Sequence, residues 1–177
     1  MCYNRPIVMR MNQKHLSALY LRTFVFGVED SLVSTVGLLA GVASADISRS
    51  TLLVIGMVLI FVEAISMAAG NFLSEFSAEE YESQHEVSPR NSIVSSILMF
   101  ISYFISGLIP LSPYLLLDSS AAFWTSICLS ISILFLLGVI RAKLSSLRPF
   151  HYGIQMSAVG GIAIIVGVVV GNIVRGL

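Results

Sequence analysis

The sequence predicts an all-α integral membrane protein with five transmembrane helices. Of its 177 residues, 56% are hydrophobic and only 11% are charged, and the mean hydropathy is +0.89. Soluble domains are usually about 45–50% apolar and roughly 25% charged, so a soluble fold of this length could not cover so much apolar surface. The formal net charge is zero, which gives no basic balance that would favour nucleic acid as a partner.

The apolar residues fall in five runs, each long enough to cross a hydrocarbon core of about 30 Å as a helix. The predicted spans are residues 23–43, 52–74, 92–111, 121–140 and 154–174. No internal repeat divides the chain, and we expect a single membrane domain over residues 1–177. The N-terminal residues lack an apolar core of leader length, so we expect no cleavable signal peptide.

The connections between the spans are polar. SADISRS (44–50) is a short turn, and residues 75–91 form the only long hydrophilic loop, which is acidic. PLSPYLLLDSS (110–120) ends the third span with two prolines, and RAKLSSLRPFHY (141–152) separates the fourth span from the fifth.

Lysine and arginine predict the orientation, because they concentrate on the cytoplasmic side of a membrane protein. Only Arg49 and Arg175 fall on one side of the predicted topology. The other side carries Arg5, Arg10, Lys14, Arg22, Arg90, Arg141, Lys143 and Arg148. We therefore expect the N-terminus and the acidic loop in the cytoplasm and the C-terminus on the opposite side.

Three acidic residues lie inside predicted spans: Glu29 and Asp30 in the first and Glu63 in the second. Each costs roughly 2.5–3.5 kcal/mol near the centre of a membrane helix, so such acids mark an ion pathway or a paired site by default. Protonated acids that hold helices together are the alternative interpretation. Glu29 is one residue, about 100°, away from the face of Asp30, and we expect it to be a packing acid.

Helical periodicity places each of the other two acids on a stripe of small residues. The first stripe comprises Gly27, Asp30, Ser34, Gly37 and Gly41. The second comprises Gly56, Glu63, Met67, Gly70 and Ser74. Met67 follows Glu63 by four residues, so an oxygen donor and a thioether share one face. This combination favours Fe²⁺ or Mn²⁺ over Mg²⁺ or Ca²⁺, although a methionine in a membrane helix is most often core filling.

The acidic loop holds a second group of candidate ligands. If the second helix continues beyond the membrane, Glu79, Glu82 and Glu86 share a face with Glu75. A divalent cation would relieve the repulsion between them. A solvated acidic loop explains the same spacing and is the simpler interpretation.

The chemistry of an enzyme is missing from the sequence. Cys2 and Cys128 are far apart and form no CxxC motif. His15, His85 and His151 all lie outside the spans, and no Ser–His or HExxH arrangement is present. We expect neither catalysis nor a resident cofactor.

Four segments, in order, resemble the vacuolar iron transporter family. FVFGVEDSLVSTVGLLAGVA (24–43) is similar to the family's first helix, and VEAISMAAGNFLSEFSAEEYE (62–82) to its second helix and cytoplasmic continuation. GLIPLSPYLL (107–116) resembles the end of the third helix, and residues 141–174 resemble the last helix with its glycine pair and late glycine.

The resemblance implies a function and assigns residues to it. Asp30 falls on the first-helix aspartate and Met67 on the second-helix methionine of the metal path, and Glu63 falls where some members have aspartate. Family members are dimers whose path lies where these helices meet across the two-fold axis. They export Fe²⁺ or Mn²⁺ from the cytosol in exchange for protons, which would make this chain a homodimeric antiporter.

The chain departs from the family pattern in two places. Ser31 stands where the family usually has a glycine after the aspartate. Larger members carry a helical metal-binding domain between the second and third spans, and the 17 residues of 75–91 are too few for one. Glu79, Glu82 and Glu86 would then be a reduced version of that domain.

Two other functions fit the same sequence. A proton-coupled exporter of organic cations can also use a membrane glutamate, but it usually needs aromatic walls, and neither stripe contains an aromatic residue. A membrane subunit that does not transport would use the stripes only to bind partner helices. For the location, we expect a prokaryotic plasma membrane, or a vacuolar or other organelle membrane in a eukaryote.

Overall fold

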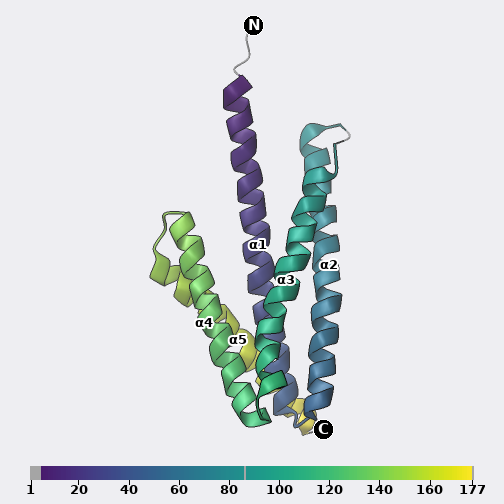
Figure 1. The fold of residues 1–177 in the computed structure, drawn as a ribbon, viewed down its shortest axis with the longest axis vertical. Coiled ribbons are helices and arrows are strands. Elements are labelled where there is room, and N and C mark those ends of the chain that lie inside the picture. The colour runs from purple at the N-terminus through teal and green to yellow at the C-terminus, as the bar shows by residue number, and fades with distance from the viewer. Residues whose placement is uncertain (1–4, 86, 177) are drawn as a thin grey trace.

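A computed structural model describes residues 5–85 and 87–176, and these residues fold into five α-helices without strands (Figure 1). The helices are α1 (Arg5–Ser44), α2 (Arg49–Ser83), α3 (Arg90–Leu116), α4 (Ser119–Leu144) and α5 (Pro149–Arg175). All five are long and apolar enough to cross a membrane. The predicted fold class, an all-α integral membrane protein that crosses the bilayer several times, is confirmed.

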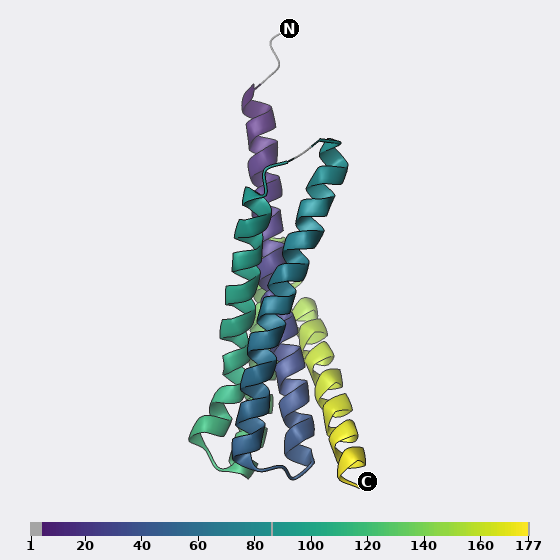
Figure 2. The ribbon, with the colours of Figure 1, turned by 90° about the vertical axis from the view of Figure 1, so that its right-hand side faces the viewer.

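Two ends of the bundle can be distinguished in Figures 1 and 2. The N-side carries the start of α1 and the α2–α3 and α4–α5 connections. The C-side carries the α1–α2 and α3–α4 connections and the C-terminus. This arrangement separates the helix ends as the predicted topology does, while the assignment of the N-side to the cytoplasm stays a prediction. The single-domain assignment also stays a prediction.

Two helices extend past their predicted spans. Residues 75–83, assigned to the acidic loop with a continuing helix left open, continue α2 by two further turns, because no proline or glycine interrupts that stretch. The third span was expected to end at 111, but α3 passes through Pro110 and Pro113 to Leu116. Pro113 cannot donate to the Ile109 carbonyl, and Ser112 Oγ donates to that oxygen instead at 2.8 Å.

Helix α1 lies at the centre of the bundle, where it packs against all four other helices. Its closest partner is α5. A Cβ atom at Gly167 or Gly171 would overlap the carbonyl group of Gly37 or Gly41, so the two helices can approach this closely only without side chains at these positions. Gly167 and Gly171 of α5 therefore form the contact with α1.

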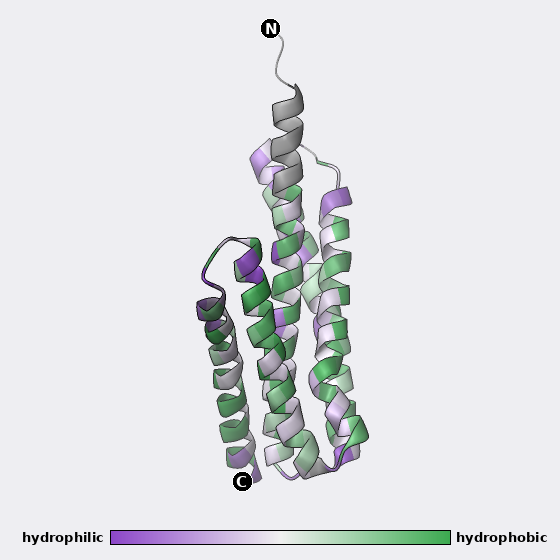
Figure 3. Ribbon diagram, turned by 60° about the vertical axis from the view of Figure 1, so that its left-hand side comes forward, coloured by the Kyte–Doolittle hydropathy of each residue, from purple (hydrophilic) through white to green (hydrophobic). Residues whose placement is uncertain are grey.

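The outer faces of the bundle are apolar. Figure 3 shows hydrophobic residues along the lengths of the helices and hydrophilic residues mainly toward the helix ends. Helices α2 and α5 are the least covered by the rest of the chain. Large side chains on them are more than half exposed, for example Val62, Ile65, Ile165 and Val169. Such surfaces face lipid in a membrane protein.

Candidate functional site

The structure brings Asp30 of α1 and Glu63 of α2 together inside the membrane-spanning part of the bundle. Both side chains are half-buried, and the two carboxylates are close enough to interact electrostatically. The ion pairs found among the described side chains, Arg22–Glu75 and Arg175–Asp46, involve neither of them. Two carboxylates therefore share an apolar region that supplies them with no ion-paired cation.

Tyr103 of α3 connects this acid pair to the third helix. Its side chain is fully buried, and its hydroxyl donates to Glu63 Oε2. The same hydroxyl shares a 2.8 Å hydrogen bond with Ser34 Oγ of α1. Tyr103 also lies close enough to interact electrostatically with Asp30. We define the polar cluster as Asp30, Ser34, Glu63 and Tyr103, which come from three different helices.

Sequence reasoning missed Tyr103. A buried tyrosine usually finds a hydrogen-bond partner for its hydroxyl, so a tyrosine in the middle of a membrane span signals a second polar group nearby. Ser31, which departs from the family pattern, supports the same contact, because its Oγ donates to the Tyr103 carbonyl at 2.6 Å. The serine thus links α1 to α3 directly beside the acid pair.

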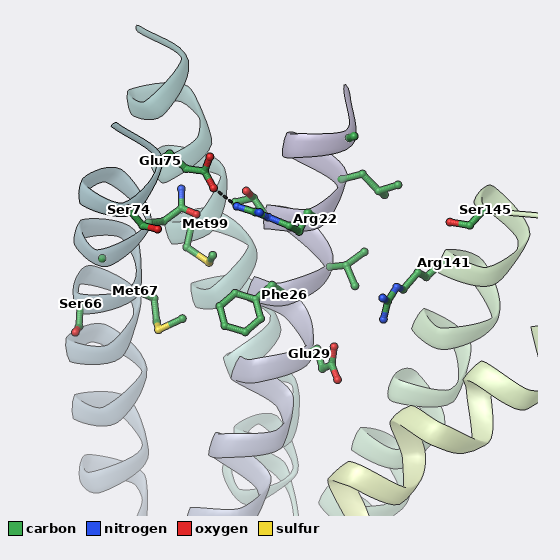
Figure 4. A pocket seen from close by; sticks show the side chains of 16 residues that line it. Arg22, Phe26, Glu29, Ser66, Met67, Ser74, Glu75, Met99, Arg141 and Ser145 are labelled. Carbon is green, nitrogen blue, oxygen red and sulfur yellow. Dashed lines mark hydrogen bonds and ion pairs between the residues drawn. The ribbon is translucent and has the colours of Figure 1, made fainter. Parts of the chain in front are cut away.

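A cavity of about 800 Å³ opens between α1, α2, α3 and α4 on the N-side of the polar cluster (Figure 4). Met67 lines this cavity, one turn along α2 from Glu63, and Met99 of α3 adds a second thioether. Asp30 and Glu63 lie outside the lining. The three predicted ligands are therefore divided between the polar cluster and the wall of the adjoining cavity.

The charged residues of the cavity are acids accompanied by arginines. Glu75 forms an ion pair with Arg22, marked by the dashed line in Figure 4. Glu29 lies close enough to Arg141 of α4 to interact electrostatically, and both line the cavity. Glu29 was expected to be a packing acid. Its place beside Arg141 gives it a charged partner that the sequence did not indicate.

The acids after the second span do not assemble into a metal centre. Glu79 and Glu82 lie on the last turns of α2, half-buried and exposed respectively, and Glu86 lies outside the described residues. Among the side chains that the structure describes (residues 16–85, 87–118 and 120–176), no three His, Cys, Asp or Glu come together as a group that could hold a metal ion. A metal-collecting role for Glu79, Glu82 and Glu86 stays a prediction.

The small residues of the first span contact two different helices. A Cβ atom at Gly27 would lie 3.1 Å from Met99 Sδ of α3, whereas one at Gly41 would lie 2.7 Å from the Gly167 carbonyl oxygen of α5. Gly37 also packs on α5. The small residues of this stripe therefore allow close approach of two helices, α3 at Gly27 and α5 at Gly37 and Gly41. Small residues signal close approach, but not which helix approaches.

The second stripe is also divided. A Cβ atom at Gly56 would lie 2.7 Å from a methyl carbon of Leu111 in α3, whereas one at Gly70, which lines the cavity, would meet nothing within 4 Å. Gly56 therefore serves the packing of α2 on α3, and Gly70 leaves room in the cavity beside Met67.

Several known proteins are similar to this chain. A vacuolar iron transporter 1 of Tulipa gesneriana is 23% identical, and the alignment covers 85% of this chain and 86% of the relative. A vacuolar iron transporter 1 of Arabidopsis thaliana is 22% identical, with 85% of each chain covered. An uncharacterised protein of Methanocaldococcus jannaschii is 28% identical over 81% of this chain and 83% of its own length.

The alignment with the tulip protein spans 212 positions, although this chain has only 177 residues, so the relative carries residues that this chain lacks. The short connection between the second and third spans of this chain predicts such a difference in length. The sequence profile of the VIT family matches residues 21–88 and 79–172, two stretches that overlap at the end of α2 and the α2–α3 connection and together cover parts of all five helices. The chain therefore belongs to the VIT family.

Proposed function

We propose that the chain exports a divalent transition metal, Fe²⁺ or Mn²⁺, from the cytosol in exchange for protons. The observation that carries this proposal is the pairing of Asp30 with Glu63 inside the membrane-spanning bundle. Two carboxylates in an apolar region are costly unless a cation or protons compensate them. The relatives named vacuolar iron transporter support a metal ion as the cargo.

The cluster would exchange metal for protons through one set of oxygen atoms. With the ion bound, Asp30 and Glu63 provide anionic oxygens, and Met67, one turn away on α2, provides the thioether that favours later transition metals over Mg²⁺ or Ca²⁺. When the ion leaves, protons neutralise the carboxylates, because an unpaired charge is disfavoured there. Tyr103 holds Glu63 in position through its hydroxyl.

A homodimer would complete the coordination. One chain brings only two carboxylates to the polar cluster, and a two-fold axis would double the number of donors around one ion. Glu63 and Met67 are only half-buried within one chain, which leaves their face of α2 accessible to a second copy. The proposed export fits a prokaryotic plasma membrane and a vacuolar membrane alike, because in both the metal would enter the protein from the cytosol.

The test is metal flux into proteoliposomes with a pH gradient, with the metal and the internal pH followed by separate dyes. We expect D30N to stop the flux of Fe²⁺ and Mn²⁺ while the purified protein keeps its helical content. The matched control is D46N, the same substitution at an exposed residue of the α1–α2 turn, which should transport like the parent. Parental flux through D30N, or metal flux without proton movement, would contradict the proposal.

A second function, proton-coupled export of an organic cation, is favoured by one observation. The sequence showed no aromatic residue on either stripe, but the structure places Phe26 in the wall of the 800 Å³ cavity beside Glu29. That volume is within the range that holds a drug-sized ligand, and an aromatic face attracts a cation. If a lipophilic cation competes with Fe²⁺ for flux and F26A removes the competition, this function gains support.

A further inference from the structure

Glu75 differs from the other ion-paired acid of the described residues in where its charge lies. Its side chain is only 13% exposed, while that of its partner Arg22 is 70% exposed. In the Arg175–Asp46 pair on the C-side, the acid is 78% exposed. Figure 4 shows Arg22 reaching from α1 across to Glu75 on α2. The Glu75 carboxylate thus lines the cavity and is covered by an arginine that is largely exposed at the surface of the bundle.

Other donor atoms lie between Glu75 and the polar cluster. Glu63, Met67, Asn71 and Glu75 follow one another at intervals of four residues, so they lie along neighbouring turns of α2. The last three line the cavity. The Asn71 amide nitrogen donates to Ser95 Oγ at 2.9 Å, which leaves the amide oxygen as an acceptor. From Glu75 toward Glu63, the next donors along α2 are therefore the amide oxygen of Asn71 and the sulfur of Met67.

Met99 adds a donor to this route from a third helix. It projects from α3 and is drawn in Figure 4 between Glu75 and Met67. Two thioethers in one cavity give little to Mg²⁺, which is hard and keeps its water, and more to softer transition metals. The cavity therefore combines the anionic oxygen of Glu75 with the thioethers of Met67 and Met99.

We propose that Glu75 is the entry ligand for the transported divalent metal and that Arg22 occupies this carboxylate in the metal-free state as a tethered, competing cation. The inference rests on the proposed metal transport. A metal ion arriving at the N-side displaces the Arg22 guanidinium from Glu75, passes Asn71 and the thioethers of Met99 and Met67, and reaches the pair of Asp30 and Glu63. Arg22 returns to Glu75 after the ion has passed.

The test depends on two variants that break the same ion pair. In E75Q the entry ligand is lost, so the metal concentration at half-maximal flux (KM) should rise about tenfold, the lower end of the loss seen for supporting groups at metal sites. In R22Q the competitor is lost, so KM should fall about two- to fivefold, the range that an exposed ion pair is worth. The double variant should behave like E75Q, and maximal flux should change less than KM in all three.

A purely structural ion pair predicts a different result. Because either substitution removes the same contact, a structural role would move KM in the same direction in both variants, or in neither. Either of those results overturns the inference. D46N and R175Q, which break the exposed ion pair on the C-side with the same two kinds of substitution, are the matched controls and should leave KM unchanged.

A second readout separates this inference from the transport proposal. Mn²⁺ is titrated calorimetrically into each detergent-solubilised variant, and the same opposite shifts are expected in the dissociation constant. If the parent carries no metal flux, the transport proposal fails, and the titration still decides the role of Glu75. Equal Mn²⁺ affinity in E75Q, R22Q and the parent would overturn the entry site whatever the flux assay shows.

Discussion

The acids in the interior of the bundle and the acids that line the cavity are the same chemical groups in opposite situations. Glu75 and Glu29 each have an arginine nearby, Arg22 and Arg141, contributed by other helices. Asp30 and Glu63 have each other and the hydroxyl of Tyr103. The cavity thus compensates its negative charge with protein cations, whereas the polar cluster depends on a cation or protons from outside. In the proposed mechanism, this difference separates a place of entry from a place of binding.

The largest effect should come from removing a charge of the polar cluster. We expect E63Q to lower Fe²⁺ flux by more than about 100-fold, above the 10- to 100-fold loss typical of groups that only support a metal ligand. E80Q on the exposed end of α2 is the matched control and should transport normally. Initial rates in proteoliposomes measure both, and a loss in E63Q no greater than in E80Q would remove the distinction between the two groups of acids.

The next effect is at Tyr103. Y103F keeps the ring but removes the hydroxyl that donates to Glu63 and meets Ser34. We expect flux to fall about tenfold, since the ligand loses its supporting hydrogen bond but keeps its charge. Y152F on the α5 side of the bundle, outside the polar cluster, is the control. Unchanged flux in Y103F would show that Glu63 needs no positioning.

A change in the packing of α1 on α5 should lower the free energy of unfolding without altering the two groups of acids. G167A places a Cβ atom against the Gly37 carbonyl, so α1 and α5 must move apart. Overpacking of this kind costs typically about 1–3 kcal/mol. Thermal unfolding in detergent should show the loss, while G161A, where a Cβ would meet nothing within 4 Å, should unfold like the parent. Equal stability of the two variants would contradict the close contact of α1 with α5.

The smallest effect is expected at the exposed ion pair of the C-side. R175Q removes the 3.2 Å contact with Asp46. Exposed pairs contribute about 0–1 kcal/mol, so neither the unfolding temperature nor the flux should change measurably. A clear loss of flux would show that the C-side ion pair belongs to the path, and the contrast with Arg22 and Glu75 would then disappear.

The sequence predicted those features that depend on neighbouring residues along the chain. Five hydrophobic runs predicted five helices because hydropathy is a local property, and the intramembrane acids stood out because of their cost. The likeness to the family aligned Asp30 and Met67 with the metal path. The helix ends were less predictable, since serine hydroxyls such as that of Ser112 allow α3 to continue past its prolines.

Contacts between helices could not be predicted in the same way. The pairing of Tyr103 with Glu63 depends on how α3 crosses α1 and α2, and the pairing of Arg22 with Glu75 joins residues 53 positions apart. Periodicity assigns a residue to a face of its own helix, but it does not identify the helix that covers this face. Gly37 and Gly41 are an example: periodicity assigned them to one face of the first helix, but it did not indicate that α5 covers them.

The position of a bound ion distinguishes the two groups of acids most directly. A crystal of the protein grown with Mn²⁺ can be measured by anomalous diffraction, which locates the metal independently of the protein. We expect an anomalous peak between the carboxylates of Asp30 and Glu63, with Tyr103 still donating to Glu63. A crystal in which Mn²⁺ occupies other sites, while these two carboxylates contact no metal, would contradict the role assigned to the polar cluster.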